Sequence, residues 1–285
     1  MRKIVILSLM LALSIAYAGC ASPAVAEGLT EHTLRVDGEE RFYLVYDPDG
    51  RAAERPLVLD MHGWGGTAYE QLGASGFTAI AEEEGIIVVY PQATGEELLW
   101  GLADDVSYIE AVRDAVSADY PVDESRIYAT GFSAGGFMAH YLGGALSDRI
   151  AAVASVGGLI PDPDFAALGG AVTDAADLIE LALPPEPIRP VPVMMIHGTN
   201  DEVVPYAGVE PTLAVWADWN GCGEPVMDFA EEAGPPVTRY EDCADDARMI
   251  LIPFDDQDGH IIPREAGGLD APEVIWAFFS TFVLT

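Results

Sequence analysis

Basic residues are scarce in this sequence. Its 285 residues contain 13 lysines and arginines against 47 aspartates and glutamates, a formal net charge of −34, and the only lysine is Lys3. A surface this acidic repels the phosphate backbone of nucleic acids and the surface of anionic membranes, so we expect no nucleic-acid partner. An acidic recognition surface is one alternative. We favour a surface that keeps the protein soluble, for instance in salty surroundings where ions screen the self-repulsion.

Cysteine is also scarce, with three residues at Cys20, Cys222 and Cys243. An odd number in an exported chain leaves one thiol unpaired. Cys222 and Cys243 flank a short, turn-rich, acidic segment and could pair in an oxidising compartment, where closing the loop would contribute about 3 kcal/mol on the chain-entropy model. No cluster of histidines and cysteines has the spacing of metal ligands, so we expect no metal and no cofactor.

The N-terminus contains an apolar stretch that could be taken for a transmembrane helix. Two basic residues precede an apolar run from Ile4 to about Ala18, and small residues follow it. This pattern is typical of a secretory signal, here residues 1–19, and the run is too short and wrongly flanked for a transmembrane helix. We therefore predict an exported protein.

The end of this signal allows two interpretations. The sequence "AGC" ending at Cys20 resembles a bacterial lipobox, in which the cysteine is lipidated and becomes the mature N-terminus, although Tyr17 stands where an aliphatic residue is usual. The alternative is ordinary cleavage, after Ala18 or before Glu27, which would give a secreted or periplasmic protein. We favour lipidation, with residues 20–30 as a tether, so that membrane contact would come only through this anchor.

Short apolar runs bounded by turn residues predict strands buried on both faces of a sheet. They lie at 57–61, 86–90, 127–130, 152–156, 192–196 and 249–252. Helical patterns alternate with them, at 69–84, 105–118, 133–146, 209–220 and 272–283. An alternating segment around Asp37 and Gly38 predicts an antiparallel hairpin before them. We predict one α/β domain over residues 31–285, with a mainly parallel sheet and helices on both faces.

One segment, residues 157–190, interrupts this alternation. It has no strand pattern and contains "PDPD" and "PPEPIRP". A connection this long inside a compact domain is usually functional or disordered. We expect a lid or cap over the site.

The pentapeptide "GFSAG" at 131–135 fits the pattern G-x-S-x-G and stands between a predicted strand and a predicted helix. In that context it predicts a nucleophile elbow, a sharp turn that exposes the hydroxyl of Ser133 above a helix N-terminus that favours developing negative charge. The alternative is an ordinary turn residue in a glycine-rich corner. A serine needs a base and an orienting acid to become a strong nucleophile, so the prediction requires both.

The base and the acid should follow the serine in the order acid, then histidine. Only His260, of the five histidines, falls in a loop after the last predicted strand and before the last predicted helix. Asp201 follows a strand and a tight turn, and it is the expected acid. Three carboxylates close to the histidine in sequence compete with it: Asp255, Asp256 and Asp258. For three other histidines we expect structural roles: His62, His140 and His197.

The segment "LDMHGWGG" leaves a predicted strand and enters a glycine-rich loop. In this architecture the oxyanion is held by the N–H of the residue after the nucleophile and by an N–H from such a loop. We expect these donors to be Ala134 and Trp64, with Gly63 as the second choice in the loop.

Several blocks, in this order, resemble the secreted esterase family that includes polyhydroxybutyrate depolymerases, feruloyl esterases and acetylxylan esterases. They include "RPLVLDMHGWGG", "VDESRIYATGFSAGGFMAHYL", "VPVMMIHGTNDEVVPY" and "WNGCGEPV", and the resemblance runs from about Leu34 to Phe282. It implies an α/β-hydrolase fold, a Ser133–Asp201–His260 triad and hydrolysis of carboxylic esters through an acyl-enzyme. Family members commonly carry cysteines near 222 and 243, which supports their pairing.

The departures from the family pattern lie around the expected pocket. Trp100 matches a tryptophan of the family and is our expected pocket residue, but the cysteine that often precedes it is Leu99 here. The family's "GHTWP" around the histidine is "GHIIP" in this chain. The substrate therefore stays open among short-chain esters, feruloyl or acetyl esters of polysaccharides, and hydroxyalkanoates. Alternative functions are a serine peptidase of the same fold, a polymer depolymerase and a non-catalytic surface-binding lipoprotein.

Overall fold

The structure of the chain is a computed structural model that describes residues 27–48, 50, 52–161, 183–228, 236–256, 259–264 and 269–284. The expected secretory signal and Cys20 lie outside the described residues. So does most of the expected lid, of which only residues 157–161 and 183–190 are described.

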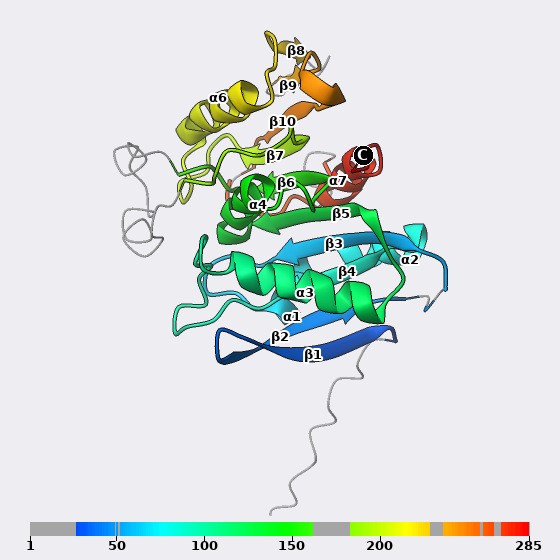
Figure 1. Cartoon of the computed structure of the whole chain (residues 1–285). Coiled ribbons are helices and arrows are strands. Elements are labelled where there is room, and N and C mark those ends of the chain that lie inside the picture. The colour runs from blue at the N-terminus through cyan, green and yellow to red at the C-terminus, as the bar shows by residue number, and fades with distance from the viewer. Residues whose placement is uncertain are drawn as a thin grey trace, which may run out of the picture.

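One ten-stranded sheet forms the centre of the described part, with strand order β1-β2-β4-β3-β5-β6-β7-β10-β9-β8 (Figure 1). The first five strands along the chain are β1 (Leu29–Val36), β2 (Glu39–Tyr46), β3 (Arg55–Met61), β4 (Ile87–Pro91) and β5 (Val122–Phe132). The other five are β6 (Ala152–Val156), β7 (Val193–Gly198), β8 (Val226–Asp228), β9 (Val237–Tyr240) and β10 (Met249–Phe254).

The six central strands, from β4 to β10 in the spatial order, pair parallel to one another. Antiparallel strands flank them, because β1 and β2 form the predicted hairpin on one side and β9 and β8 pair antiparallel on the other. The predicted α/β fold with a mainly parallel sheet and an N-terminal hairpin is confirmed. The two short strands β8 and β9 were not predicted, since residues such as Val226 and Met227 are exposed and form no buried apolar run.

Helices cover both faces of the sheet (Figure 1). They are α1 (Ala68–Ala74), α2 (Phe77–Glu84), α3 (Val106–Asp119), α4 (Ala134–Ala145), α6 (Val209–Trp219) and α7 (Ala271–Phe279). One buried cluster joins α3, α4 and α6 to one face of the strands. A second cluster joins α1, α2 and α7 to the other face. This is the two-faced core that parallel strands with apolar side chains on both faces require.

The predicted helix over 69–84 is wrong in one respect, because two helices occupy this segment. They meet at Ser75 and Gly76, and Gly76 has a φ of 82°, in the left-handed region that favours glycine. The guanidinium group of Arg264 lies where a β-carbon at this position would stand.

Candidate active site

The pentapeptide around Ser133 forms a strained corner between β5 and α4. Ser133 has φ 53° and ψ −119°, a conformation rare for a residue with a side chain, and its amide donates to the carbonyl of Val156 at 2.8 Å. Strain of this kind costs on the order of 1–3 kcal/mol and persists where the surrounding structure fixes it. The corner places the hydroxyl of Ser133 at the edge of the sheet, beside the first turn of α4.

The glycines of the corner are required by close approach of the backbone rather than by positive φ. A β-carbon on Gly131 would lie 2.6 Å from the carbonyl oxygen of Met61 and 2.5 Å from the backbone of Gly135. A β-carbon on Gly135 would overlap the same carbonyl of Met61, which belongs to β3. The glycines therefore allow the corner to press against the neighbouring strand.

Three side chains meet at this corner in a hydrogen-bonded chain. The Nε2 atom of His260 lies 2.9 Å from the Oγ atom of Ser133, and its Nδ1 atom lies 2.7 Å from Oδ2 of Asp201. The His260 side chain is 12% exposed and that of Asp201 is fully buried. An imidazole between a hydroxyl and a carboxylate is the arrangement in which the imidazole can accept the hydroxyl proton.

Two glycines bring the histidine loop against the acid loop, although Asp201 and His260 are 59 residues apart. A β-carbon on Gly198 would overlap the carbonyl of Gly259, and one on Gly259 would lie 2.7 Å from the backbone of Asn200. The structure therefore brings Asp201 to His260, rather than a carboxylate from the histidine's own loop. Of the competing carboxylates, Asp258 lies outside the described residues.

The carboxylate of Asp201 is held by its own turn. The amides of Val203 and Val204 donate to its Oδ1 atom at 2.9 and 2.8 Å. His197 closes the same turn, since its Nε2 lies 2.8 Å from the carbonyl oxygen of Val204 and 3.5 Å from Oδ2 of Asp201. Burial lowers the pKa of His197, so the ring stays neutral at physiological pH.

The glycine-rich loop after β3 lies against Ser133. A β-carbon on Gly63 would stand 3.3 Å from Cβ of Ser133. The carbonyl oxygen of Gly63 lies 2.7 Å from Nδ1 of His62 and accepts from the amide of Gly66 at 3.0 Å. Because the N–H of a trans peptide points opposite to its C=O, these two bonds turn the amide of Trp64 away from the inside of the loop.

His62 is itself fixed from three sides. Its Nε2 atom accepts from the amide of Ala93 at 3.1 Å and lies 3.2 Å from Nε2 of Gln92, so the ring proton is on Nδ1. Burial lowers the pKa of His62 and keeps it neutral. His62 thus joins the loop after β3 to the loop after β4.

Trp100 does not line the site cavity, contrary to our expectation. It is 1% exposed, its ring packs 4.9 Å from that of His62, and its Nε1 atom donates to the carbonyl of His62 at 2.8 Å. A large aromatic side chain with one donor is well suited to fill such a buried position. Through these contacts with His62, Trp100 supports the glycine-rich loop.

A cavity of about 380 Å³ opens beside the ring of His260, whose Nε2 atom is hydrogen-bonded to Ser133. The glycine-rich loop, α1 and the loop after β10 contribute its walls. Its lining includes Trp64, Glu70, Gln71, Phe132, Ile261 and Ile262. The indole of Trp64 is 43% exposed, whereas Gln71 is buried. No pattern in the sequence around Gln71 predicts a site residue there; the one signal is the polar residue Asp60 within the apolar strand β3.

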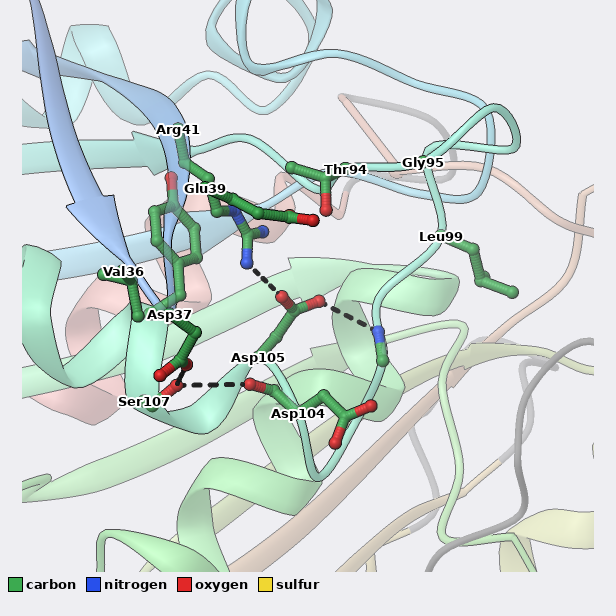
Figure 2. Close-up of a pocket in the computed structure, with 12 residues that line it drawn as sticks. Val36, Asp37, Glu39, Arg41, Thr94, Gly95, Leu99, Asp104, Asp105 and Ser107 are labelled. Atoms are coloured by element: carbon green, nitrogen blue, oxygen red, sulfur yellow. Dashed lines mark hydrogen bonds and ion pairs between the residues drawn. The ribbon is translucent and has the colours of Figure 1, made fainter.

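A second cavity, of about 330 Å³, lies between the β1–β2 hairpin and the loop before α3 (Figure 2). Asp105 forms a buried ion pair with Arg41 and accepts from the amide of Gly101 at 2.9 Å. Arg41 also donates to the carbonyl of Gln92 at 2.9 Å. These bonds anchor both ends of the loop that carries Trp100.

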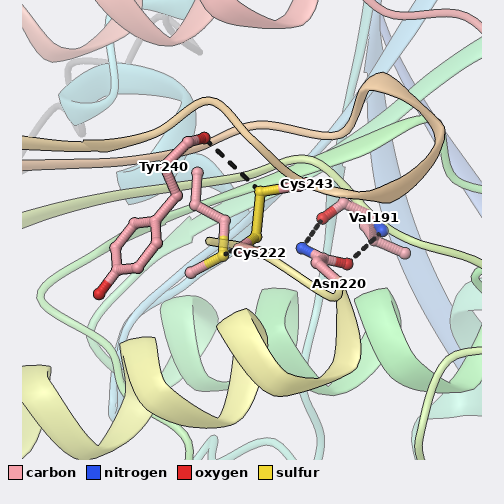
Figure 3. The surroundings of a disulfide bond; sticks show 6 residues. Val191, Asn220, Cys222, Tyr240 and Cys243 are labelled. Atoms are coloured by element: carbon pink, nitrogen blue, oxygen red, sulfur yellow. Dashed lines mark hydrogen bonds between the residues drawn. A yellow bond between two sulfur atoms is a disulfide. The ribbon is translucent and has the colours of Figure 1, made fainter. Parts of the chain in front are cut away.

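Cys222 and Cys243 form a disulfide in the structure, as the sequence predicted (Figure 3). The bond ties the end of α6 to the segment that leads into β10. Beside it, the side-chain amide of Asn220 exchanges two hydrogen bonds of 2.8 Å with the backbone of Val191. The disulfide thus braces the part of the sheet from which the loops of Asp201 and His260 extend.

Comparisons with known proteins agree with this geometry. Residues 103–221 match the family model described as phospholipase/carboxylesterase. The chain is 28% identical over 211 residues to a bifunctional acetylxylan esterase/xylanase of Neocallimastix patriciarum, covering 72% of this chain and 28% of that protein. It is 28% identical over 266 residues to feruloyl esterase C of Emericella nidulans, covering 88% of this chain and 87% of that protein.

The solved acetyl xylan esterase of Aspergillus awamori has the same fold. It superposes with a TM-score of 0.63 at 16% identity, covering 88% of this chain and 99% of that one. The chain is an α/β-hydrolase related to feruloyl and acetylxylan esterases. This α/β-hydrolase spans less than a third of the bifunctional relative's length, so the activity of that whole protein is not carried over to it.

Two further observations concern the described part of this α/β-hydrolase. No group of three or more histidines, cysteines and carboxylates there is arranged to hold a metal ion. No helix there is long and apolar enough to cross a membrane.

Proposed function

We propose that this α/β-hydrolase cleaves carboxylic esters with Ser133 as its nucleophile. The observation that carries the proposal is the unbroken chain of hydrogen bonds from Ser133 through His260 to Asp201, beside an open cavity. His260 takes the hydroxyl proton as Ser133 attacks the ester carbonyl, while Asp201 fixes the imidazole tautomer and stabilises the imidazolium. His260 then protonates the leaving alcohol, and a water molecule repeats the attack on the acyl-enzyme.

The amides of Ala134 and Trp64 hold the oxyanion in this mechanism. Ala134 is the first residue of α4, where amides of the first helical turn lack partners within the helix. The Trp64 amide is directed by the two bonds that hold the carbonyl of Gly63. A donor of this kind contributes about 3–4 kcal/mol to lowering the barrier.

The names of relatives, feruloyl and acetylxylan esterases, support a proposal for the substrate class. We propose short-chain esters and feruloyl or acetyl esters of polysaccharides, with hydroxyalkanoates as a further class. We also propose that the protein is exported, with Cys20 lipidated after removal of residues 1–19. Palmitate labelling of the expressed chain and its Cys20→Ala variant tests the anchor.

The experiment that tests the activity compares initial rates of the protein, its Ser133→Ala variant and its Ser155→Ala variant. Ser155 is a buried serine near the same corner, so its replacement controls for local disturbance. Substrates are p-nitrophenyl acetate and butyrate, methyl ferulate, acetylated xylan, hydroxybutyrate oligomers and a peptide p-nitroanilide. We expect ester turnover that is lost only in Ser133→Ala. Turnover of the anilide alone would indicate a peptidase, and no turnover on any substrate would indicate a binding protein.

A further inference from the structure

Asp60 is a buried carboxyl group that the proposed mechanism does not use. It lies in β3, two residues before His62, and it is 1% exposed. Its Oδ1 atom accepts from Nε2 of Gln71 at 2.7 Å, and the side chain of Ser75 also interacts with the carboxyl group. Burying a carboxyl group in an apolar strand is costly, so its contact with Gln71 calls for an explanation.

Gln71 stands between Asp60 and the site cavity. Its side chain, from α1, lines the cavity together with His62, Gly63 and His260. The amide nitrogen is bound to Asp60. The amide oxygen has no hydrogen-bond partner within the described residues, and it is not completely buried. Since the nitrogen and the oxygen branch from one carbon, fixing the nitrogen on Asp60 leaves the oxygen to the cavity.

The rest of the wall near Gln71 is mainly apolar. Trp64, Phe132 and two isoleucines, Ile261 and Ile262, supply most of it. A volume of about 380 Å³ falls within the range of sites that take drug-sized ligands, and it exceeds the needs of an acetyl group. A single polar acceptor in such a wall sets the orientation of a bound group and discriminates against analogues that cannot satisfy it.

Charge further restricts the kind of substrate group that the cavity can bind. Glu70 lies at the exposed rim of the cavity, where its carboxylate accepts from the hydroxyl of Thr67 at 3.0 Å. With a formal charge of −34 on the whole chain, this rim disfavours an anionic group. The cavity therefore suits a neutral, mostly apolar group that carries a hydrogen-bond donor.

We propose that Gln71, oriented by Asp60, determines specificity by accepting a hydrogen bond from a hydroxyl group on an otherwise apolar arm of the ester. The inference rests on the proposed ester hydrolysis and deepens it. The arm is either the acyl or the alcohol part, because the cavity borders His260, which is hydrogen-bonded to Ser133. Asp60 acts as a positioning residue, since its carboxyl holds the amide so that the oxygen faces the substrate before it binds.

The test compares kcat/KM within two matched ester pairs. The acyl pair is methyl 3-(4-hydroxyphenyl)propanoate and methyl 3-phenylpropanoate, and the alcohol pair is 2-(4-hydroxyphenyl)ethyl acetate and 2-phenylethyl acetate. We expect the hydroxylated member of one pair to be preferred by about tenfold or more, the value of one buried hydrogen bond. The pair that shows the preference identifies the arm that occupies the cavity.

The variants separate Gln71 from its neighbours. Gln71→Leu should lose the preference, because kcat/KM for the hydroxylated ester should fall to that of its partner without the hydroxyl group. Asp60→Asn keeps an acceptor for the amide nitrogen and should keep the preference, as should the rim variant Glu70→Gln. Thermal melts of each variant verify folding.

Two outcomes would overturn the inference. One is hydrolysis of all four esters with no preference in either pair. The other is a preference that survives in Gln71→Leu, and its loss in Glu70→Gln would then assign it to the rim carboxylate. Both leave the proposed ester hydrolysis intact. Absence of turnover on every ester, p-nitrophenyl acetate included, overturns the proposed function itself, and this inference with it.

Discussion

His62 donates a hydrogen bond from its ring to the carbonyl oxygen of the next residue, Gly63, over 2.7 Å. The bond fixes the peptide plane whose other side carries the amide of Trp64. A peptide in the opposite orientation would present a carbonyl oxygen to the developing oxyanion and repel it. The orientation of this one peptide therefore decides whether the loop can act as an oxyanion hole.

Replacing His62 by alanine should reduce kcat about a hundredfold, with KM changed by less than about threefold, because the loss falls on the transition state. His140→Ala is the matched control. His140 is equally buried and accepts from Nε1 of Trp216 at 3.0 Å, away from the glycine-rich loop. Steady-state kinetics on p-nitrophenyl butyrate and thermal melts check both. Equal losses of kcat in the two variants would refute a positioning role for His62.

His197 should act on Asp201 through the turn that they share. In His197→Ala the carbonyl of Val204 loses its partner, so the two amides that hold the Asp201 carboxylate become less well placed. We expect kcat to fall about tenfold with little change in KM. The same His140→Ala control applies, and kcat measured for the two variants in parallel decides the point. A kcat in His197→Ala that matches the control would limit His197 to packing.

Asp60 should make stability depend on pH. Burial raises the pKa of Asp60 from 3.8 to about 7, while Tyr90 beside it stays neutral because burial raises the pKa of that phenol as well. Between pH 3.8 and 7 the folded state keeps a proton on Asp60 that the unfolded state has lost. The contribution of Asp60 to the free energy of unfolding is therefore largest below pH 3.8 and is lost as the pH rises to 7. The loss amounts to roughly 4 kcal/mol at most.

Asp60→Asn isolates this effect, because an amide cannot ionise. We expect the variant and the parent to have similar stabilities at pH 4 and the variant to be the more stable at pH 8. Urea unfolding at both pH values measures the difference. Equal stabilities of the two proteins at pH 8, or a more stable parent, would contradict the raised pKa.

The excess of acidic residues should make the protein tolerant of salt. With 47 acidic and 13 basic residues, screening of surface repulsion favours the compact state. We expect the melting temperature and the ester turnover at constant pH to hold or rise between 0.1 and 2 M sodium chloride. A steep fall in both over that range would show that the charge serves another purpose.

Much of the fold follows from local pattern. Runs such as residues 152–156 are apolar throughout and short, and the structure makes them a central strand buried on both faces. The segment "GFSAG" between strand and helix predicted the corner at Ser133, and the order of the later loops pointed to Asp201 and His260 as its neighbours. These signals lie within a few residues of each other along the chain, so the sequence displays them directly.

What escaped the sequence depends on contacts between distant segments. At the break between α1 and α2, the guanidinium group of Arg264, from the far end of the chain, lies where a β-carbon of Gly76 would stand. The burial of Trp100 depends on the carbonyl of His62, 38 residues away. Asp60 and Gln71 pair across a loop and a helical turn. No local pattern in the sequence marks these partners. The sequence therefore predicts Trp100 as a pocket residue, although it is buried beneath the glycine-rich loop.

The central claim is that Ser133 is a nucleophile activated by His260 and Asp201, and covalent labelling tests it most directly. The protein is treated with a fluorophosphonate, digested with trypsin and analysed by mass spectrometry. Cleavage after Arg126 and Arg149 gives a peptide with two serines, Ser133 and Ser147, which fragmentation separates. We predict one adduct per chain, on Ser133, absent from Ser133→Ala and formed at least a hundredfold more slowly in His260→Ala. An adduct elsewhere, or equal labelling of Ser133→Ala, would contradict the account.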